Sequence, residues 1–193
     1  MFQTIVNAFK IKEVRNKILI TIALIFVYRL GCHIPVPGVT AFEGVGEYSF
    51  LQVMSAVSGG ALQMGTFFAM GIGPYINASI IIQLLTIGFP SLEELQKSGE
   101  EGKKKINKYT KYIALALALV QATGMTLGLI RSALETDSVF FIVTVILTLV
   151  SASTMLMWIG DKITEKGLGN GSSIIIFIGI IAGIPKDIKQ IIA

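Results

Sequence analysis

The chain has 193 residues, of which 53% are hydrophobic and only 15% are charged, and its mean hydropathy is +0.74. This composition excludes a soluble globular domain and predicts an integral membrane protein. The net charge is +4, and the single cysteine, Cys32, excludes an internal disulfide.

Residues 1–17 mix apolar and basic side chains, which predicts an amphipathic helix at the lipid headgroups that anchors and orients the chain. An apolar run from about Ile18 to Ile34 follows. Because no small-residue cleavage site succeeds it, we predict a retained membrane span rather than a signal peptide. Arg29, near the far end of this span, is expected to extend to the membrane interface. Pro35 ends the helix.

The longest uncharged run extends over the 45 residues from Tyr48 to Leu92, more than twice the roughly 20 residues that cross a bilayer. We place a second span at about Phe67 to Phe89. Residues 50–64, before it, are apolar but too short and too rich in Gly and Ser to span. They form either a re-entrant half-helix, enclosed by protein or a water-filled cavity, or a packed extracellular loop.

Polar groups interrupt the second span. On helical spacing Ile72, Ile76 and Ile80 stack along one face. The amides of Asn77 and Gln83 would each cost several kcal/mol if they met only lipid. Part of this helix must therefore face something other than lipid, and Pro74 is expected to bend it.

Three more spans are predicted between charged residues, at 112–130, 138–160 and 167–185, which are 19, 23 and 19 residues long. Alternating crossings place 12 of the 16 basic residues on the side of the N-terminus. The positive-inside rule then makes the N-terminus cytoplasmic and the C-terminus external.

The loop from Pro90 to Lys111 is strongly basic. It is either a solvated determinant of topology or a docking surface for an acidic or ribonucleoprotein partner, since clustered lysines attract phosphate-rich surfaces. Its candidate docking residues are Lys103, Lys104, Lys105 and Lys108.

No catalytic constellation is present, so we predict that the protein is not an enzyme and has no cofactor. One histidine, His33, and one cysteine cannot supply the three or four ligands of a zinc site, so no metal is expected. The glycines of Gly167–Gly171 have no preceding strand and no Lys-Ser/Thr, which favours a tight turn into the fifth span over a phosphate loop.

Three stretches resemble the signatures of the SecY family, whose members form the central subunit of the bacterial protein-conducting channel. They are Ser-Gly-Gly-Ala-Leu at 58–62, Gly-Ile-Gly-Pro-Tyr-Ile-Asn-Ala-Ser-Ile-Ile-Ile-Gln-Leu-Leu at 71–85, and Met-Trp-Ile-Gly-Asp-Lys-Ile-Thr-Glu-Lys-Gly-Leu-Gly-Asn-Gly at 157–171. The resemblance covers the whole chain and implies an all-α integral membrane fold. Residues 18–193 would be the N-terminal five-span half of an inverted-repeat, ten-helix channel, with a re-entrant plug half-helix at about 50–64.

The resemblance also assigns roles to residues. Ile72, Ile76 and Ile176 match pore-ring positions, where branched apolar side chains exclude water and ions without holding the substrate. Ser172 falls where many family members place a further apolar ring residue. The implied plug residues are Phe50, Leu51, Val53, Met54, Val57, Gly59, Gly60, Leu62 and Met64. The implied contacts of the signal sequence at the lateral gate are Asn77, Ile80, Ile81 and Gln83.

The implied function is passive secretion of preproteins across, and insertion of helices into, the cytoplasmic membrane. The implied partners are the SecE and SecG subunits, the SecA motor ATPase, the ribosome, the preprotein with its signal peptide, membrane lipids and the C-terminal half of the same channel. Half of a secondary transporter, with Asn77 and Gln83 as solute ligands, is the rival interpretation. Against it, the spans hold almost no ionisable residue besides Arg29. A structural fragment without activity is a third possibility.

Overall fold

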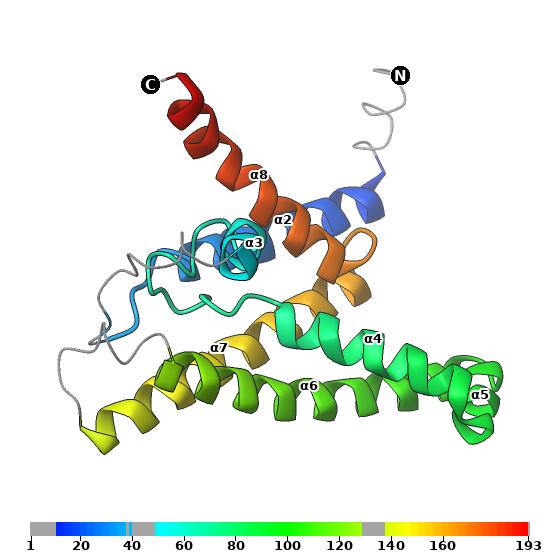
Figure 1. Cartoon of the computed structure of the whole chain (residues 1–193). Coiled ribbons are helices and arrows are strands. Elements are labelled where there is room, and N and C mark those ends of the chain that lie inside the picture. The colour runs from blue at the N-terminus through cyan, green and yellow to red at the C-terminus, as the bar shows by residue number, and fades with distance from the viewer. Residues whose placement is uncertain (1–10, 38, 40–48, 129–137, 193) are drawn as a thin grey trace.

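The structure is a computed structural model, and it describes residues 11–37, 39, 49–128 and 138–192. The described residues form seven helices (Figure 1). These are α2 (Lys12–Gly31), α3 (Ser49–Val57), α4 (Gly73–Gly88), α5 (Pro90–Lys97), α6 (Glu100–Gly128), α7 (Val139–Lys166) and α8 (Gly171–Ile192). Within the same residues the expected all-α architecture is confirmed, because the β-pairing consists of isolated bridges such as that between Pro35 and Thr66.

Two long helices form the base of the fold. α6 and α7, of 29 and 28 residues, pack along each other, and α4 lies antiparallel on the first half of α6 (Figure 1). α2 and α8 pack on α7, and the short helix α3 lies against α8. The first and the last described helix, α2 and α8, therefore belong to the layer opposite α6.

The five expected spans correspond to α2, α4, α6, α7 and α8. By length and composition, α6 and α7 can each cross a membrane. α4 and α5, which meet at a bend of 105°, would make a third span if they are counted as one broken span. α2 is not apolar enough by this criterion, because the charged residues Arg15, Lys17 and Arg29 interrupt it. The apolar helix at Gly171–Ile184 is shorter than a full membrane span. The protein is a membrane protein, and its described residues include two or three spans that are evident from length and composition.

The second span starts later than expected. Residues 67–72 form turns, and the helix begins at Gly73, after Gly71 at a φ of +57°. Pro74 stands in the first turn of α4, where its missing N–H leaves no intrahelical bond unmade. The expectation that Pro74 bends this helix was therefore wrong. The bend lies at the other end, where α4 gives way to α5 and Pro90 starts the new helix.

The helix that contains the first expected span starts before residue 18. α2 continues without a break from Lys12 through the apolar run. Residues 1–10 of the expected amphipathic segment lie outside the described residues.

Small side chains recur at every fourth position along the buried face of α6, where it packs on α4 and α7. The buried residues of α6 include Ala114, Ala118 and Ala122, none of which exposes any surface. On α4 the buried positions also recur every fourth residue, with Ala78 meeting Ala114 in one apolar cluster that Met157 of α7 completes. Small residues at such positions let helix backbones approach closely.

Candidate functional site

The short helix α3 lies between the start of α4 and the middle of α8. A Cβ atom added to Gly73 would stand 3.2 Å from the Cε atom of Met54, and one added to Gly179 would overlap the backbone oxygen of Val57. α3 is thus a true helix held by protein on two sides. Within residues 50–64 the chain is therefore helical up to Val57 and forms turns from Ser58 onward.

The other expected plug residues differ in their surroundings. Val53 and Met64 are exposed, Met54 and Val57 are half-buried, and Gly59 and Gly60 form the turn after α3, both with positive φ. Leu62 is buried in the main hydrophobic core against α6 and α7. The side chains of Phe50 and Leu51 lie outside the described residues. The expected plug segment therefore has a partly exposed helix and, after it, a turn region in which Leu62 is buried and Met64 is exposed.

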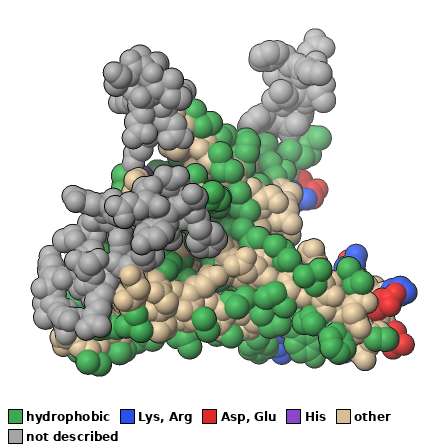
Figure 2. All heavy atoms as spheres, viewed as in Figure 1, with side chains coloured by type: hydrophobic (Ala, Val, Ile, Leu, Met, Phe, Trp, Pro, Cys, Tyr) green, Lys and Arg blue, Asp and Glu red, His purple; other side chains and the backbone are tan. Residues whose placement is uncertain are grey.

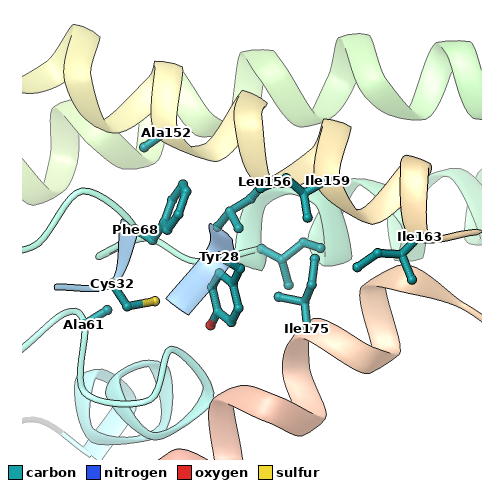
Figure 3. Packing of buried hydrophobic residues seen from close by; sticks show 10 residues of the cluster. Tyr28, Cys32, Ala61, Phe68, Ala152, Leu156, Ile159, Ile163 and Ile175 are labelled. Carbon is teal, nitrogen blue, oxygen red and sulfur yellow. The ribbon is translucent and has the colours of Figure 1, made fainter. Parts of the chain in front are cut away.

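The expected ring positions converge from two elements. Ile76 of α4 and Ile176 of α8 are both half-buried and pack against one hydrophobic cluster, which Figure 3 shows between α7 and α8 with Tyr28 of α2 at its centre. Ser172 is half-buried one turn before Ile176. Elements about 100 residues apart in sequence thus bring these side chains together.

Ile72 does not continue the face of Ile76 and Ile80. It precedes the first residue of α4, is 3% exposed and lies inside the cluster, whereas Ile80 is 50% exposed. A Cβ atom on Gly160 of α7 would be 3.7 Å from the Cδ1 atom of Ile72 and 3.6 Å from that of Ile175. The expectation that Ile72, Ile76 and Ile80 share one helix face is therefore wrong for Ile72, because α4 starts after this residue.

The expected gate residues lie on the part of α4 that α6 leaves uncovered. Asn77 and Gln83 are exposed, and Ile80 and Ile81 are 50% and 38% exposed, while Ala78 and Ile82 between them are buried. The Gln83 amide donates to the Ser79 hydroxyl at 3.4 Å. Asn77 and Gln83, six residues apart, point about 120° away from each other around the helix, so their amides do not converge on one solute.

The glycines between α7 and α8 form a turn, as the sequence predicted, and side-chain caps that it did not predict complete the turn. The Asn170 carboxamide oxygen accepts the backbone N–H groups of Ser172 at 3.0 Å and Ser173 at 3.3 Å, and the Thr164 hydroxyl accepts that of Gly171 at 2.9 Å. Gly169 has a φ of +65°, which a side chain rarely adopts. The turn fixes where α8 begins, and with it the place of Ser172 and Ile176.

The turn is also tied to the first helix by a contact that the sequence did not reveal. The hydroxyl of Thr21 in α2 accepts the N–H of Leu168 at 3.0 Å, and it lies so close to Gly167 that a Cβ atom there would overlap it. Periodicity places Thr21 on a helix but carries no information about a partner 147 residues away.

The expected docking lysines, Lys103, Lys104, Lys105 and Lys108, are all exposed in the first turns of α6. Figure 2 shows visible charged side chains gathered at the end of the molecule where α5 lies, beside a largely hydrophobic remainder of the described face. Gly102 lets this end fold tightly, since a Cβ atom there would overlap the Leu95 carbonyl. A compact, charged tip therefore ends the α4–α6 pair.

Charged side chains also stand at the end of α7. Lys111 of α6 and Asp161 of α7 form an ion pair of 2.6 Å, which spacing did not predict. The Lys162 ammonium donates to the Glu165 carboxylate and, as the main cause, lowers the pKa of that carboxyl. Among the described residues, no group of three His, Cys, Asp or Glu side chains stands close enough to hold a metal ion.

Arg29 does not reach the interface as expected. Its guanidinium turns inward and donates to the backbone oxygen of Ile178 in α8, and it lies 5.4 Å from the ring centroid of Tyr28. An arginine inside a span needs such a partner, because an unpaired charge is costly there.

Comparison with known proteins identifies the family. The SecY family model matches residues 66–193. The chain belongs to the SecY family. The protein translocase subunit SecY of Lactococcus lactis subsp. cremoris is 43% identical over 98% of this chain and 45% of its own length, and SecY of Pseudomonas aeruginosa is 48% identical over 86% and 39%. The chain thus matches the N-terminal half of SecY and spans less than half the length of these relatives.

Solved structures agree on the fold. The chain "Sec61 in the Canine ribosome-channel complex from the endoplasmic reticulum" is similar with a TM-score of 0.66 at 20% identity, covering 86% of this chain and 36% of that one. A structure of the SecY protein that concerns its plug domain gives a TM-score of 0.64 at 21% identity, covering 90% and 36%. At these identities the likeness shows a common helical arrangement.

Proposed function

We propose that this chain supplies the N-terminal half of a passive protein-conducting channel in the cytoplasmic membrane, with its N-terminus on the cytoplasmic side. The observation that carries the proposal is the position of α3. It lies between the start of α4 and the middle of α8, the two helices that hold Ile76 and Ile176. A short helix at that place is positioned to close a passage from one side.

The proposed seal has two parts. Ile76, Ile176 and Ser172 form this half's share of a ring, which the C-terminal half of the channel completes, and bulky apolar side chains around a narrow opening exclude water and ions by dewetting. Ile72 supports the ring from behind, because it is packed between α4 and Gly160. α3 and the following turn, within residues 50–64, act as the plug.

The proposed gate is the uncovered face of α4. Asn77, Ile80, Ile81 and Gln83 would contact a signal sequence that leaves sideways toward the lipid, with the opposite wall supplied by the C-terminal half. Their exposure in this half supports the role, since α6 already covers the other face of the helix.

The channel would have no chemistry of its own and no cofactor, so partners must drive the substrate. We propose SecA and the ribosome as alternative drivers and SecE and SecG as accessory subunits. The likeness to a Sec61 chain from a ribosome-channel complex supports the ribosome as a partner. Lys103, Lys104, Lys105 and Lys108, exposed at the charged tip, suit contact with acidic or phosphate-rich partners.

The seal is tested in the complete channel. Ile76→Asn and Ile176→Asn should raise the ion conductance of the resting channel in planar bilayers and allow export of a reporter with a defective signal sequence. Ile22→Asn is a matched control, because Ile22 on α2 is 58% exposed and lies outside the ring cluster. Unchanged conductance together with unchanged signal stringency in both ring variants would refute the proposal.

A further inference from the structure

We propose that Arg29 is a latch that holds the turn after α3 against α8 and so keeps the plug in its seat. This inference rests on the proposed function, because it names what restrains the element that closes the passage. It concerns three segments that meet at one guanidinium: the end of α2, the turn at Gly59 and the middle of α8.

The first contact joins α2 to α8. Arg29 stands two residues before the end of α2, is half-buried, and donates from Nη2 to the carbonyl oxygen of Ile178. A carbonyl oxygen within a helix normally accepts a hydrogen bond only from the N–H group of the residue four positions later. The guanidinium of Arg29 is therefore an additional donor to the Ile178 oxygen.

The second contact joins Arg29 to the turn after α3. Gly59 has a φ of +68°, and a Cβ atom there would stand 2.8 Å from Nη1 of Arg29 and 2.9 Å from the carbonyl oxygen of Gly179. A Cβ atom on Gly179 would in turn overlap the oxygen of Val57, the last residue of α3. The backbones of α8 and of the turn after α3 thus approach each other beside the guanidinium at a distance that only glycines permit.

Electrostatics favours the seated position of α3. A helix carries partial negative charge at its C-terminal end, and a cation placed there is stabilising. Arg29 lies beside Gly59, the second residue after the C-terminal end of α3. A charge without partners is also costly in a membrane protein. If α3 moved away, Arg29 would keep the Ile178 carbonyl but lose the end of the helix. The arginine therefore biases the plug toward closure.

The latch is tested by the reactivity of a buried plug residue in the complete channel. Ser55 of α3 is 7% exposed. In a Cys32→Ser background, Ser55→Cys should react slowly with a membrane-impermeant maleimide added from outside. Adding Arg29→Leu should raise the rate about two- to fivefold, the factor expected for loss of a cation beside a helix C-terminus. Arg29→Lys should give an intermediate rate, because lysine keeps the charge but not the planar fork.

Two further variants make the result decisive. Arg15→Leu removes an exposed arginine of the same helix and should leave the rate unchanged. Gly59→Ala keeps the arginine but puts a methyl group where the guanidinium lies, so it should also raise the rate, even if Arg29→Leu fails to fold. An unchanged labelling rate in folded Gly59→Ala or Arg29→Leu channels would overturn the latch. Labelling needs no transport, so this failure is distinct from a wild-type channel that conducts no preprotein.

Discussion

Gly171 lies directly against the backbone carbonyl of Gly160, so closely that a Cβ atom at Gly171 would overlap that oxygen. The first residue of α8 therefore touches α7 without a side chain between them. This contact, the Asn170 cap and the Thr164 hydroxyl together set the direction in which α8 leaves the turn.

Replacing Gly171 by alanine should lower the thermal stability of the purified channel. The methyl group must push α7 and α8 apart, and overpacking of this kind typically costs about 1–3 kcal/mol. Gly124→Ala is the control, because nothing stands within 4 Å of the added Cβ atom and alanine is the better helix former. Thermal denaturation in detergent should show a lower Tm for Gly171→Ala only. Equal Tm values for the two variants would contradict this contact.

Replacing Thr21 by valine should loosen the tie between α2 and the α7–α8 turn. Valine keeps the shape but leaves the N–H of Leu168 without its acceptor, which costs about 1–3 kcal/mol. Thr154→Val is the matched control, since the Thr154 hydroxyl bonds only to Val150 of its own helix. We expect a lower Tm and faster proteolysis at the turn for Thr21→Val. A Tm equal to that of the control would rule out a structural role for this bond.

The ion pair between Lys111 and Asp161 should contribute little. The side chains are 47% and 29% exposed, and pairs of this kind are typically worth about 0–1 kcal/mol and weaken with salt. A double-mutant cycle with Lys111→Gln and Asp161→Asn should give a coupling energy in that range at low salt and less at high salt. A coupling above about 2 kcal/mol that salt does not reduce would show that the pair is effectively buried.

Photo-crosslinking should separate the channel from a transporter of small solutes. A crosslinkable residue at position 77 or 80 of α4 should capture a signal peptide during export, because both positions are uncovered in this half. The same residue at position 78, which exposes no surface, should capture none. Capture of a small labelled solute alone would favour the transporter interpretation, although the amides of Asn77 and Gln83 do not converge.

The sequence predicted the helices better than their ends. Lys111, Asp161 and Lys166 mark limits of apolar runs because lipid excludes charge, and each run indeed contains a helix. Residues 67–72 are as apolar as the helix that follows, and hydropathy cannot separate a buried turn from a span. The start at Gly73 depends on the left-handed backbone of Gly71 and on Pro74, whose place at a helix start was mistaken for a bend.

Contacts between distant segments were the part that the sequence could not supply. Arg29 was expected at the interface because a long side chain can reach water, but the Ile178 carbonyl, 149 residues away, binds it instead. Ile72 was grouped with Ile76 on helical spacing and on the family resemblance, but it lies before α4 and is buried in the cluster that includes Ile159 and Ile175. By contrast, Gly167–Gly171 was predicted as a turn because its residues specify their own local backbone.

The alanine contact between α4 and α6 has a mechanical consequence. Ala78 and Ala114 lie in one buried cluster and place only methyl groups between the two backbones, so α4 and α6 form a closely packed pair. We therefore expect α6 to move together with α4 when α4 is displaced sideways. A probe on the far half of α6, remote from any passing substrate, would therefore register each swing of α4.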